Sequence, residues 1–181
     1  KKPNETLTDI IINNATDGLA EALFDIAQAL KNDSVNEPAV IFSQLALYMR
    51  PNFAAAQLLL GELLDRRREY SYAIEQFTAI KPKSAYFLTA QLQIAKSWGK
   101  DNKLRKAINL LEKVSNDNPY DYRPFIQIGD LHRSLKIWDK AILAYSKALS
   151  LIPEVQNSDW IIYYSRGIAY EQSKDWKSAE L

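Results

Sequence analysis

A repeat with a period of 34 residues constrains the fold of this chain more than any other feature. One alanine series and a second series of small residues, twelve positions earlier, share this period. They are Ala39, Ala73, Ala107 and Ala141, and Ala27, Gly61, Ala95 and Gly129. Pro119 and Pro153 have the same spacing, and Pro51 precedes Pro119 by twice that distance. Because a fixed period of about 20 to 50 residues is typical of repeat architectures, we expect several copies of one structural unit.

Apolar residues within each copy follow the spacing of an amphipathic helix. Leu23, Ile26, Ala27 and Leu30, for example, lie at i, i+3, i+4 and i+7. One copy has room for two helices of about 12 to 14 residues. We predict helix breaks at 31–36, 66–68, 99–102 and 134–137. Because one helical hairpin cannot bury its apolar face alone, neighbouring hairpins are expected to stack into an all-α protein.

The residues at matching positions of each copy resemble the tetratricopeptide repeat (TPR). A small residue recurs at repeat position 8, Ala at 20, a large apolar residue near 24 and Pro at 32. The fourth copy, which begins at Tyr122, matches best, although His132 replaces the usual Tyr. Ser43 replaces an aromatic residue in the first copy, and Arg166 replaces an apolar one in the fifth. The resemblance implies an α-solenoid, a right-handed superhelix of stacked antiparallel helix-turn-helix hairpins.

The period also divides the chain. Residues 1–19 form a predicted lead-in segment or cap, with Asp17 as the expected N-cap of the next helix. The TPR domain is expected over 20–181. Its predicted copies are 20–53, 54–87, 88–121, 122–155 and a partial fifth at 160–181. Because the fifth copy stops within its second helix, we interpret the chain as a fragment of a longer, bacterial TPR-containing protein, with the truncated C-terminal edge as a candidate site of self-association.

Packing roles follow from residue size. Small residues at positions 8 and 20 allow the two helices of a hairpin to approach closely, whereas Phe77, Leu111 and Tyr145 at position 24 are expected to fill the gap against the next hairpin. His132 occupies an aromatic position of the repeat, so we interpret it as a packed helix residue.

Composition excludes several kinds of chemistry. The net charge of +1 gives no strong field for nucleic acid, and RNA binding is further disfavoured by the period of 34. Without Cys and with one His, the chain has no disulfide, thiolate metal site or multi-histidine site. Its five glycines are never closer than 30 residues, which excludes a Gly-rich phosphate loop. We therefore expect no catalytic residues, cofactor or metal. No apolar run in this sequence is long enough for a membrane span, and the compartment, cytoplasmic or periplasmic, stays open.

The resemblance implies that positions 2, 5, 9, 12 and 13 of each first helix face a concave groove that binds a peptide or a partner helix. The candidate partner-binding residues are Phe24, Gln28, Leu58, Glu62, Arg66, Leu92, Lys96, Lys100, Arg123, Ile126, Asp130, Arg133, Ile161, Tyr164 and Ile168. Position 5 is apolar in every copy, and two interpretations stay open: contact with a partner, or packing between helices. The Lys and Asn pair with which some family members hold a C-terminal carboxylate is missing, which disfavours chaperone-tail recognition.

Two functions are compatible with these features. The first is a non-enzymatic protein-protein interaction scaffold whose groove binds a peptide or partner helix. The alternative is a TPR arm that recruits substrates or partners for a larger enzyme, such as a glycosyltransferase. If position 5 contacts the partner, the double change Leu92→Glu with Ile126→Glu should abolish partner capture and leave the helical circular dichroism intact.

Overall fold

The computed structural model describes residues 14–32, 36–154 and 156–179. These residues form helices joined by short turns, with no strand among them, which confirms the predicted all-α class. The chain divides into two compact units, residues 1–86 and 87–181.

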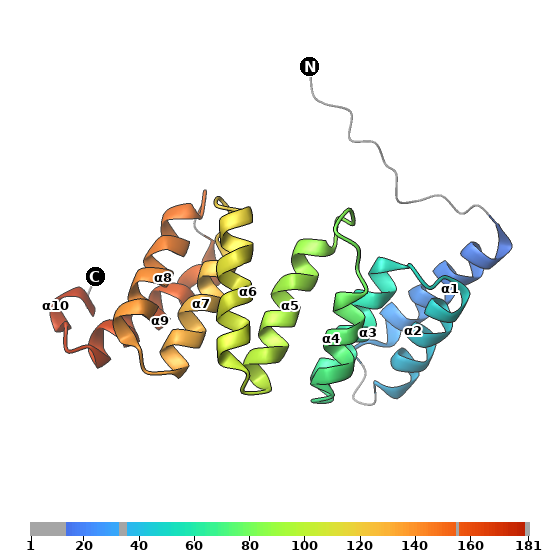
Figure 1. The fold of residues 1–181 in the computed structure, drawn as a ribbon, viewed down its shortest axis with the longest axis horizontal. Helices are drawn as coiled ribbons and strands as arrows, with labels where there is room; N and C mark the ends of the chain where they lie inside the picture. The colour runs from blue at the N-terminus through green and yellow to red at the C-terminus, as the bar shows by residue number, and fades with distance from the viewer. Residues whose placement is uncertain (1–13, 33–35, 155, 180–181) are drawn as a thin grey trace, which may run out of the picture. The chain divides into compact units, whose positions relative to one another are not determined.

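The first unit contains two helical hairpins. Its helices are α1 (Ala15–Leu30), α2 (Glu37–Met49), α3 (Ala54–Arg66) and α4 (Tyr70–Thr78). Each helix packs against the next one along the chain, and the two helices of each hairpin run antiparallel (Figure 1). Ala20, Ala46 and Ala56 are fully buried between them. These small side chains allow the close helix contacts that the repeat pattern predicts.

The start of α1 differs from the prediction. The N-cap is Asn14 and not Asp17: the Asn14 backbone is extended, and its side-chain oxygen accepts a hydrogen bond of 2.8 Å from the Asp17 backbone N–H. Asp17 lies in the first turn, where a carboxylate favours the positive end of the helix dipole. Residues 15–19 of the expected lead-in segment therefore belong to α1, and residues 1–13 lie outside the described part of the chain.

The second unit continues the same arrangement. Its elements are α5 (Phe87–Lys100), α6 (Leu104–Asp117), α7 (Arg123–Ser134), α8 (Trp138–Leu151), the 3₁₀ turn η1 (Asn157–Asp159), α9 (Trp160–Gln172) and the short α10 (Trp176–Ala179). Successive helices pack against each other, and the first helices of neighbouring hairpins also touch: α5 contacts α7, and α7 contacts α9. The predicted helix breaks at 66–68, 99–102 and 134–137 agree with the observed turns to within one or two residues, and the break predicted at 31–36 lies partly outside the described residues.

The turns after α3, α5, α7 and α9 have the same backbone geometry. In each of them the second residue after the helix has a positive φ: Arg68, Asn102, Lys136 and Lys174. The N–H of the following residue bonds back to a carbonyl five residues earlier, as from Glu69 to Leu64 at 3.0 Å. This is a Schellman cap, which usually has Gly at the left-handed position. Sequence reasoning missed its geometry because no Gly occurs at these positions.

In the second and fourth hairpins, close packing depends on glycine at position 8. A Cβ added at Gly61 would lie 2.3 Å from Cε1 of Phe77, and one at Gly129 would lie 2.6 Å from Cε1 of Tyr145. The aromatic ring at position 24 therefore fills the space over the glycine of its own hairpin. Tyr145 also belongs to a buried cluster with Ile162 of the next hairpin, so the predicted role between hairpins is correct for Tyr145 but incomplete.

The other two complete hairpins use the opposite size combination. In the first, Ala27 at position 8 accompanies the fully buried Ser43, whose hydroxyl donates a 2.7 Å hydrogen bond to the Ala39 carbonyl. In the third, Ala95 accompanies Leu111, and both are fully buried. A larger residue at position 8 is thus matched by a smaller one at position 24, which keeps the interior close-packed.

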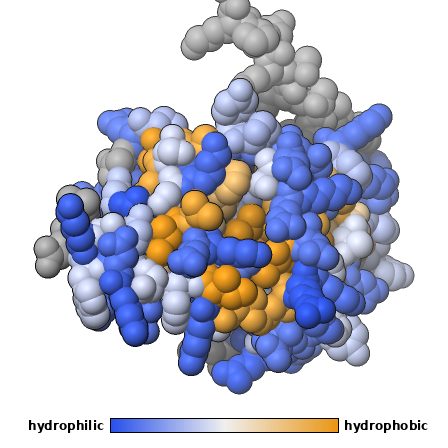
Figure 2. All heavy atoms as spheres, turned by 60° about the vertical axis from the view of Figure 1, so that its left-hand side comes forward, coloured by the Kyte–Doolittle hydropathy of each residue, from blue (hydrophilic) through white to orange (hydrophobic). Residues whose placement is uncertain are grey.

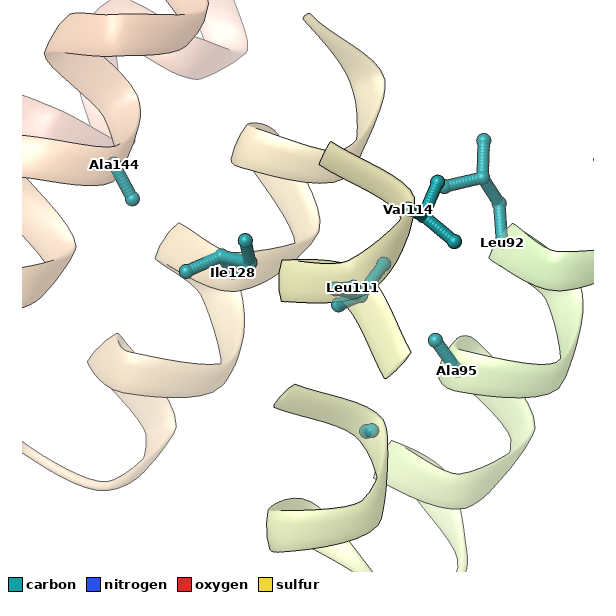
Figure 3. Packing of buried hydrophobic residues seen from close by; sticks show 7 residues of the cluster. Leu92, Ala95, Leu111, Val114, Ile128 and Ala144 are labelled. Atoms are coloured by element: carbon teal, nitrogen blue, oxygen red, sulfur yellow. The ribbon is translucent and has the colours of Figure 1, made fainter. Parts of the chain in front are cut away.

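One buried cluster connects α5, α6, α7 and α8 of the second unit. Figure 3 shows that side chains from α5, α6, α7 and α8 approach one another there. The cluster contains Leu92, Ala95, Ala107, Leu111, Val114, Ile128 and Ala144. Leu111 of α6 lies in contact with residues of its own hairpin and of the next one, as predicted for position 24. The α5–α6 and α7–α8 hairpins therefore share one core, and a second cluster joins α8 to α9.

His132 is a packed residue of α7, as predicted, and is 7% exposed. Its Nδ1 is buried and has no hydrogen-bond partner among the described residues. Burial lowers the pKa of His132, the nearby Lys140 ammonium lowers it further, and Glu112 opposes these effects. The folded protein therefore prefers the neutral imidazole.

We expect the unfolding free energy to fall on acidification because of this histidine. Since the folded pKa lies below the unfolded value of about 6.5, the stabilisation is complete above that pH and is lost as the pH falls through the folded pKa. Urea unfolding of the native chain and of His132→Phe between about pH 8 and pH 5 measures this. As the pH falls over this range, the free energy of unfolding of the native chain should decrease relative to that of His132→Phe. Parallel profiles would contradict the assignment.

Candidate functional site

The fifteen candidate residues lie on the first helix of each hairpin. In the first unit, Phe24 and Gln28 belong to α1, and Leu58, Glu62 and Arg66 belong to α3. In the second unit, the candidates on α5, α7 and α9 are brought together because these helices touch in sequence. These ten residues are Leu92, Lys96, Lys100, Arg123, Ile126, Asp130, Arg133, Ile161, Tyr164 and Ile168.

Candidates of the first unit take part in contacts within that unit. The ring of Phe24 packs at a tilt on Phe53, with 5.0 Å between ring centroids. The Gln28 side chain accepts a hydrogen bond of 2.9 Å from the Lys31 ammonium. The Arg66 guanidinium donates to the Lys31 backbone carbonyl at 2.8 Å, which links the C-terminal ends of α1 and α3. Leu58 and Glu62 are half-buried, whereas Gln28 and Arg66 are exposed.

Residues at position 5 of the second unit differ sharply in exposure. Leu92 is 6% exposed and lies beside Val114 in the core (Figure 3). Ile126 is half-buried and packs against the cluster that contains Ile162. Tyr164, at the same repeat position, is 61% exposed. Packing between helices therefore describes Leu92, whereas Tyr164 is available to a partner.

An exposed apolar surface lies on α9. Trp160 is 60% exposed, Ile161 55% and Tyr164 61%. The rings of Trp160 and Tyr164 are one helical turn apart and in contact, with 5.9 Å between centroids. We call these three residues the α9 face. Figure 2 draws one face of the molecule, on which side chains of high hydropathy gather in a group bordered by hydrophilic ones; Trp and Tyr, which have low hydropathy, are not among the orange residues of this group. Trp160 was missed by sequence reasoning because it precedes the family's groove positions.

A hydrogen-bonded network lies on the neighbouring α7. The hydroxyl of Tyr145, from α8, donates to Oδ1 of Asp130 at 2.7 Å and accepts from Nε of Arg133 at 3.1 Å. The Tyr145 ring is fully buried, whereas the Asp130 and Arg133 side chains are 49% and 41% exposed. Burial raises the pKa of the Tyr145 hydroxyl, and the hydrogen bond to Asp130 raises it further. The hydrogen bond to Tyr145 raises the pKa of Arg133.

Other cations of this surface have different surroundings. The Arg123 guanidinium pairs with the Asp121 carboxylate at 2.6 Å, and the Asp121 Oδ1 also accepts from the Arg123 backbone N–H at 2.9 Å. This hydrogen bonding to Arg123 lowers the pKa of Asp121. Lys96 and Lys100 are exposed on α5, and Ile168 is half-buried on α9. Arg123 is thus ion-paired with Asp121, and the lysines of α5 belong to the same set of cations.

The described residues contain no cluster of three or more His, Cys, Asp or Glu that could hold a metal ion. A shallow, open hollow of about 460 Å³ lies where the turn after α7 approaches the turn after α9, and it is lined by 136–139 and 172–174. Within the described ranges, no helix combines the length and apolar character of a membrane span. The α9 face and the α7 network are therefore the features from which a function can be argued.

Comparison with known proteins places this fold among TPR proteins. No family model and no curated protein sequence matches the chain. Solved structures do match: MamA of Desulfovibrio magneticus RS-1 is 21% identical over 89% of each chain, with a TM-score of 0.70. YrrB, described as a TPR protein with an unusual peptide-binding site, is 19% identical over 92% of this chain and 87% of its own, with a TM-score of 0.60. PilF of Pseudomonas aeruginosa is 17% identical over 92% of this chain and 74% of its own, with a TM-score of 0.73.

These similarities establish the fold. The chain has the all-α solenoid fold of tetratricopeptide-repeat proteins, as its 34-residue period predicts. Identities this low carry no information about which residues bind a partner. The binding surface must be argued from the side chains of this chain.

Proposed function

We propose that this protein is a non-catalytic protein-interaction scaffold that binds a peptide or partner helix on the first helices of the second unit. The observation that carries the proposal is the α9 face, where three large apolar side chains are 55% to 61% exposed beside the polar network of α7. Contiguous exposed apolar residues with a polar rim mark interaction sites more often than isolated ones do. The description of YrrB as a peptide-binding TPR protein supports the same class of function.

The two parts of this surface suit different tasks. Trp160 and Tyr164 offer large, rigid side chains, and such aromatic residues dominate binding energy at many interfaces. Asp130 and Arg133 offer charged groups that select and orient a partner. A peptide that crosses α7 and α9 would therefore obtain its affinity from apolar anchors and its register from polar contacts.

Removing the apolar anchors tests this function. A phage library of random dodecapeptides is selected on the native protein, and the affinities of enriched peptides are measured by fluorescence anisotropy. We expect Ile161→Ser with Tyr164→Ser to weaken binding at least about tenfold, because the interface loses two exposed apolar side chains. Leu143→Ser is the matched control, since Leu143 is 70% exposed on α8, outside the α9 face.

Circular dichroism should show the same helix content in all three proteins, since the changed residues are exposed. Equal peptide affinity of the double variant and the native protein would exclude the α9 face. A library that yields no binder would argue against peptide recognition as a whole.

A further inference from the structure

We propose that Arg133 is the binding site for a carboxylate of the partner, so that the ligand is an acidic peptide with an apolar residue nearby. This inference rests on the proposed function, because it names the chemistry of the peptide that the α9 face would bind.

The guanidinium of Arg133 is held in one orientation by a group that cannot move. Tyr145 is 0% exposed, its ring fills the space over Gly129, and its hydroxyl accepts the Nε–H of Arg133 at 3.1 Å. The same hydroxyl donates to Asp130, so the direction of both hydrogen bonds is set. Arg133 is therefore oriented before any ligand arrives, which reduces the entropy lost on binding.

The outer part of this guanidinium remains suited to a carboxylate. Its Nη2 forms an ion pair with Oδ1 of Asp130 at 3.6 Å, a separation longer than a hydrogen bond, so this contact leaves N–H donors of the guanidinium for a further acceptor. Oδ1 of Asp130 also accepts a hydrogen bond of 2.7 Å from the Tyr145 hydroxyl. A guanidinium has five N–H donors in a planar fork that matches the two oxygens of a carboxylate. With Nε bonded to Tyr145, the two Nη groups of the 41% exposed Arg133 side chain can bind such a group.

The charge of the surrounding helices favours an acidic ligand. The candidate residues on α5 and α7 comprise four cations and one carboxylate: Lys96, Lys100, Arg123, Arg133 and Asp130. Positive candidates on these two helices therefore outnumber negative ones, although the whole chain has a net charge of only +1. A peptide with Asp or Glu is complementary to this surface, and a basic one is not.

The positions of Arg133 and Tyr164 also limit the spacing within the ligand. They lie on touching helices at repeat positions 12 and 5. Neighbouring helix axes are about 8 to 10 Å apart, and seven residues span about 10 Å along a helix. Since an extended peptide rises about 3.3 Å per residue, the acidic and apolar residues of the ligand should be roughly four residues apart.

The test uses the enriched peptides and their Glu→Gln and Asp→Asn analogues as probes. We expect the selected sequences to contain an acidic residue about four positions from an aromatic or aliphatic one. Arg133→Gln should weaken binding of the acidic peptide about 10-fold to 100-fold and leave the neutral analogue unaffected, because a charge-assisted bidentate contact is lost. Lys147→Gln, which removes an exposed cation of α8, is the control and should leave both affinities unchanged.

Tyr145→Phe tests the orienting role separately. It removes only the hydroxyl that holds Arg133, so affinity for the acidic peptide should fall several-fold, by less than in Arg133→Gln, with no change for the neutral analogue. Equal affinity of the native protein for acidic and neutral peptides, or unchanged binding by Arg133→Gln, would overturn the carboxylate site. If Ile161→Ser with Tyr164→Ser still weakens binding at least about tenfold in that case, the peptide-binding surface stands and only the acidic specificity fails.

Discussion

Gly61→Ala is expected to lower the free energy of unfolding by about 1 to 3 kcal/mol, although alanine is the better helix former. The added methyl group would lie 2.3 to 2.7 Å from three ring atoms of Phe77, closer than carbon atoms approach each other. Phe77 is 1% exposed, so its ring has no free space into which it can move. Urea unfolding monitored by circular dichroism measures the effect.

Two further variants test this explanation. Gly167 is also a position 8 glycine in a helix, but a Cβ there would have the Ala179 carbonyl oxygen 3.7 Å away, an ordinary contact. Gly167→Ala should therefore stabilise the protein by up to about 1 kcal/mol, as intrinsic helix propensity predicts. Phe77→Leu should reduce the cost of Gly61→Ala, because the pair then reproduces Ala95 with Leu111. Similar destabilisation in Gly61→Ala and Gly167→Ala would argue against the steric explanation.

The periodic pattern was sufficient to predict the fold. Small residues every 34 positions specify where two helices approach, and polar breaks between apolar stripes locate the turns. The pattern could not predict which combination of residue sizes fills the space between the two helices of each hairpin. Considered alone, Ser43 is a departure from the repeat pattern. Together with Ala27, however, its small, buried side chain allows the two helices to pack closely. The turn geometry at Lys136 was equally hidden, because a left-handed residue other than Gly leaves no clear sequence signal.

The candidate site was also predicted only in part, and the reason differs from the one that applies to packing and turns. Repeat position specifies the direction in which a side chain leaves its helix, but exposure depends on which neighbours cover it. Leu92 and Tyr164 share position 5 and differ from 6% to 61% in exposure. The hydroxyl of Tyr145 could not be assigned to the surface network from its sequence position, since the same residue is also a core residue.

Leu92→Glu should destabilise the second unit by about 3 to 5 kcal/mol, because it places an unpaired carboxylate in an apolar core. The Leu92 side chain packs beside Val114 and near Leu111 (Figure 3). The double change Leu92→Glu with Ile126→Glu, which sequence reasoning expects to spare the helices, is therefore expected to reduce the helical circular dichroism signal. Thermal and urea unfolding of the single variant measure the loss.

Tyr164→Glu is the matched control for Leu92→Glu, since it makes the same charge at the same repeat position on an exposed helix face. Its stability should stay within about 0.5 kcal/mol of the native protein, while its affinity for apolar peptides falls. The pH dependence of stability also distinguishes the two variants. Burial would raise the pKa of the carboxyl group that Leu92→Glu introduces, so the destabilisation should be largest near neutral pH and shrink as the pH falls and the group becomes neutral. Equal stability of the two variants at neutral pH would mean that position 92 is accessible to solvent and available to a partner after all.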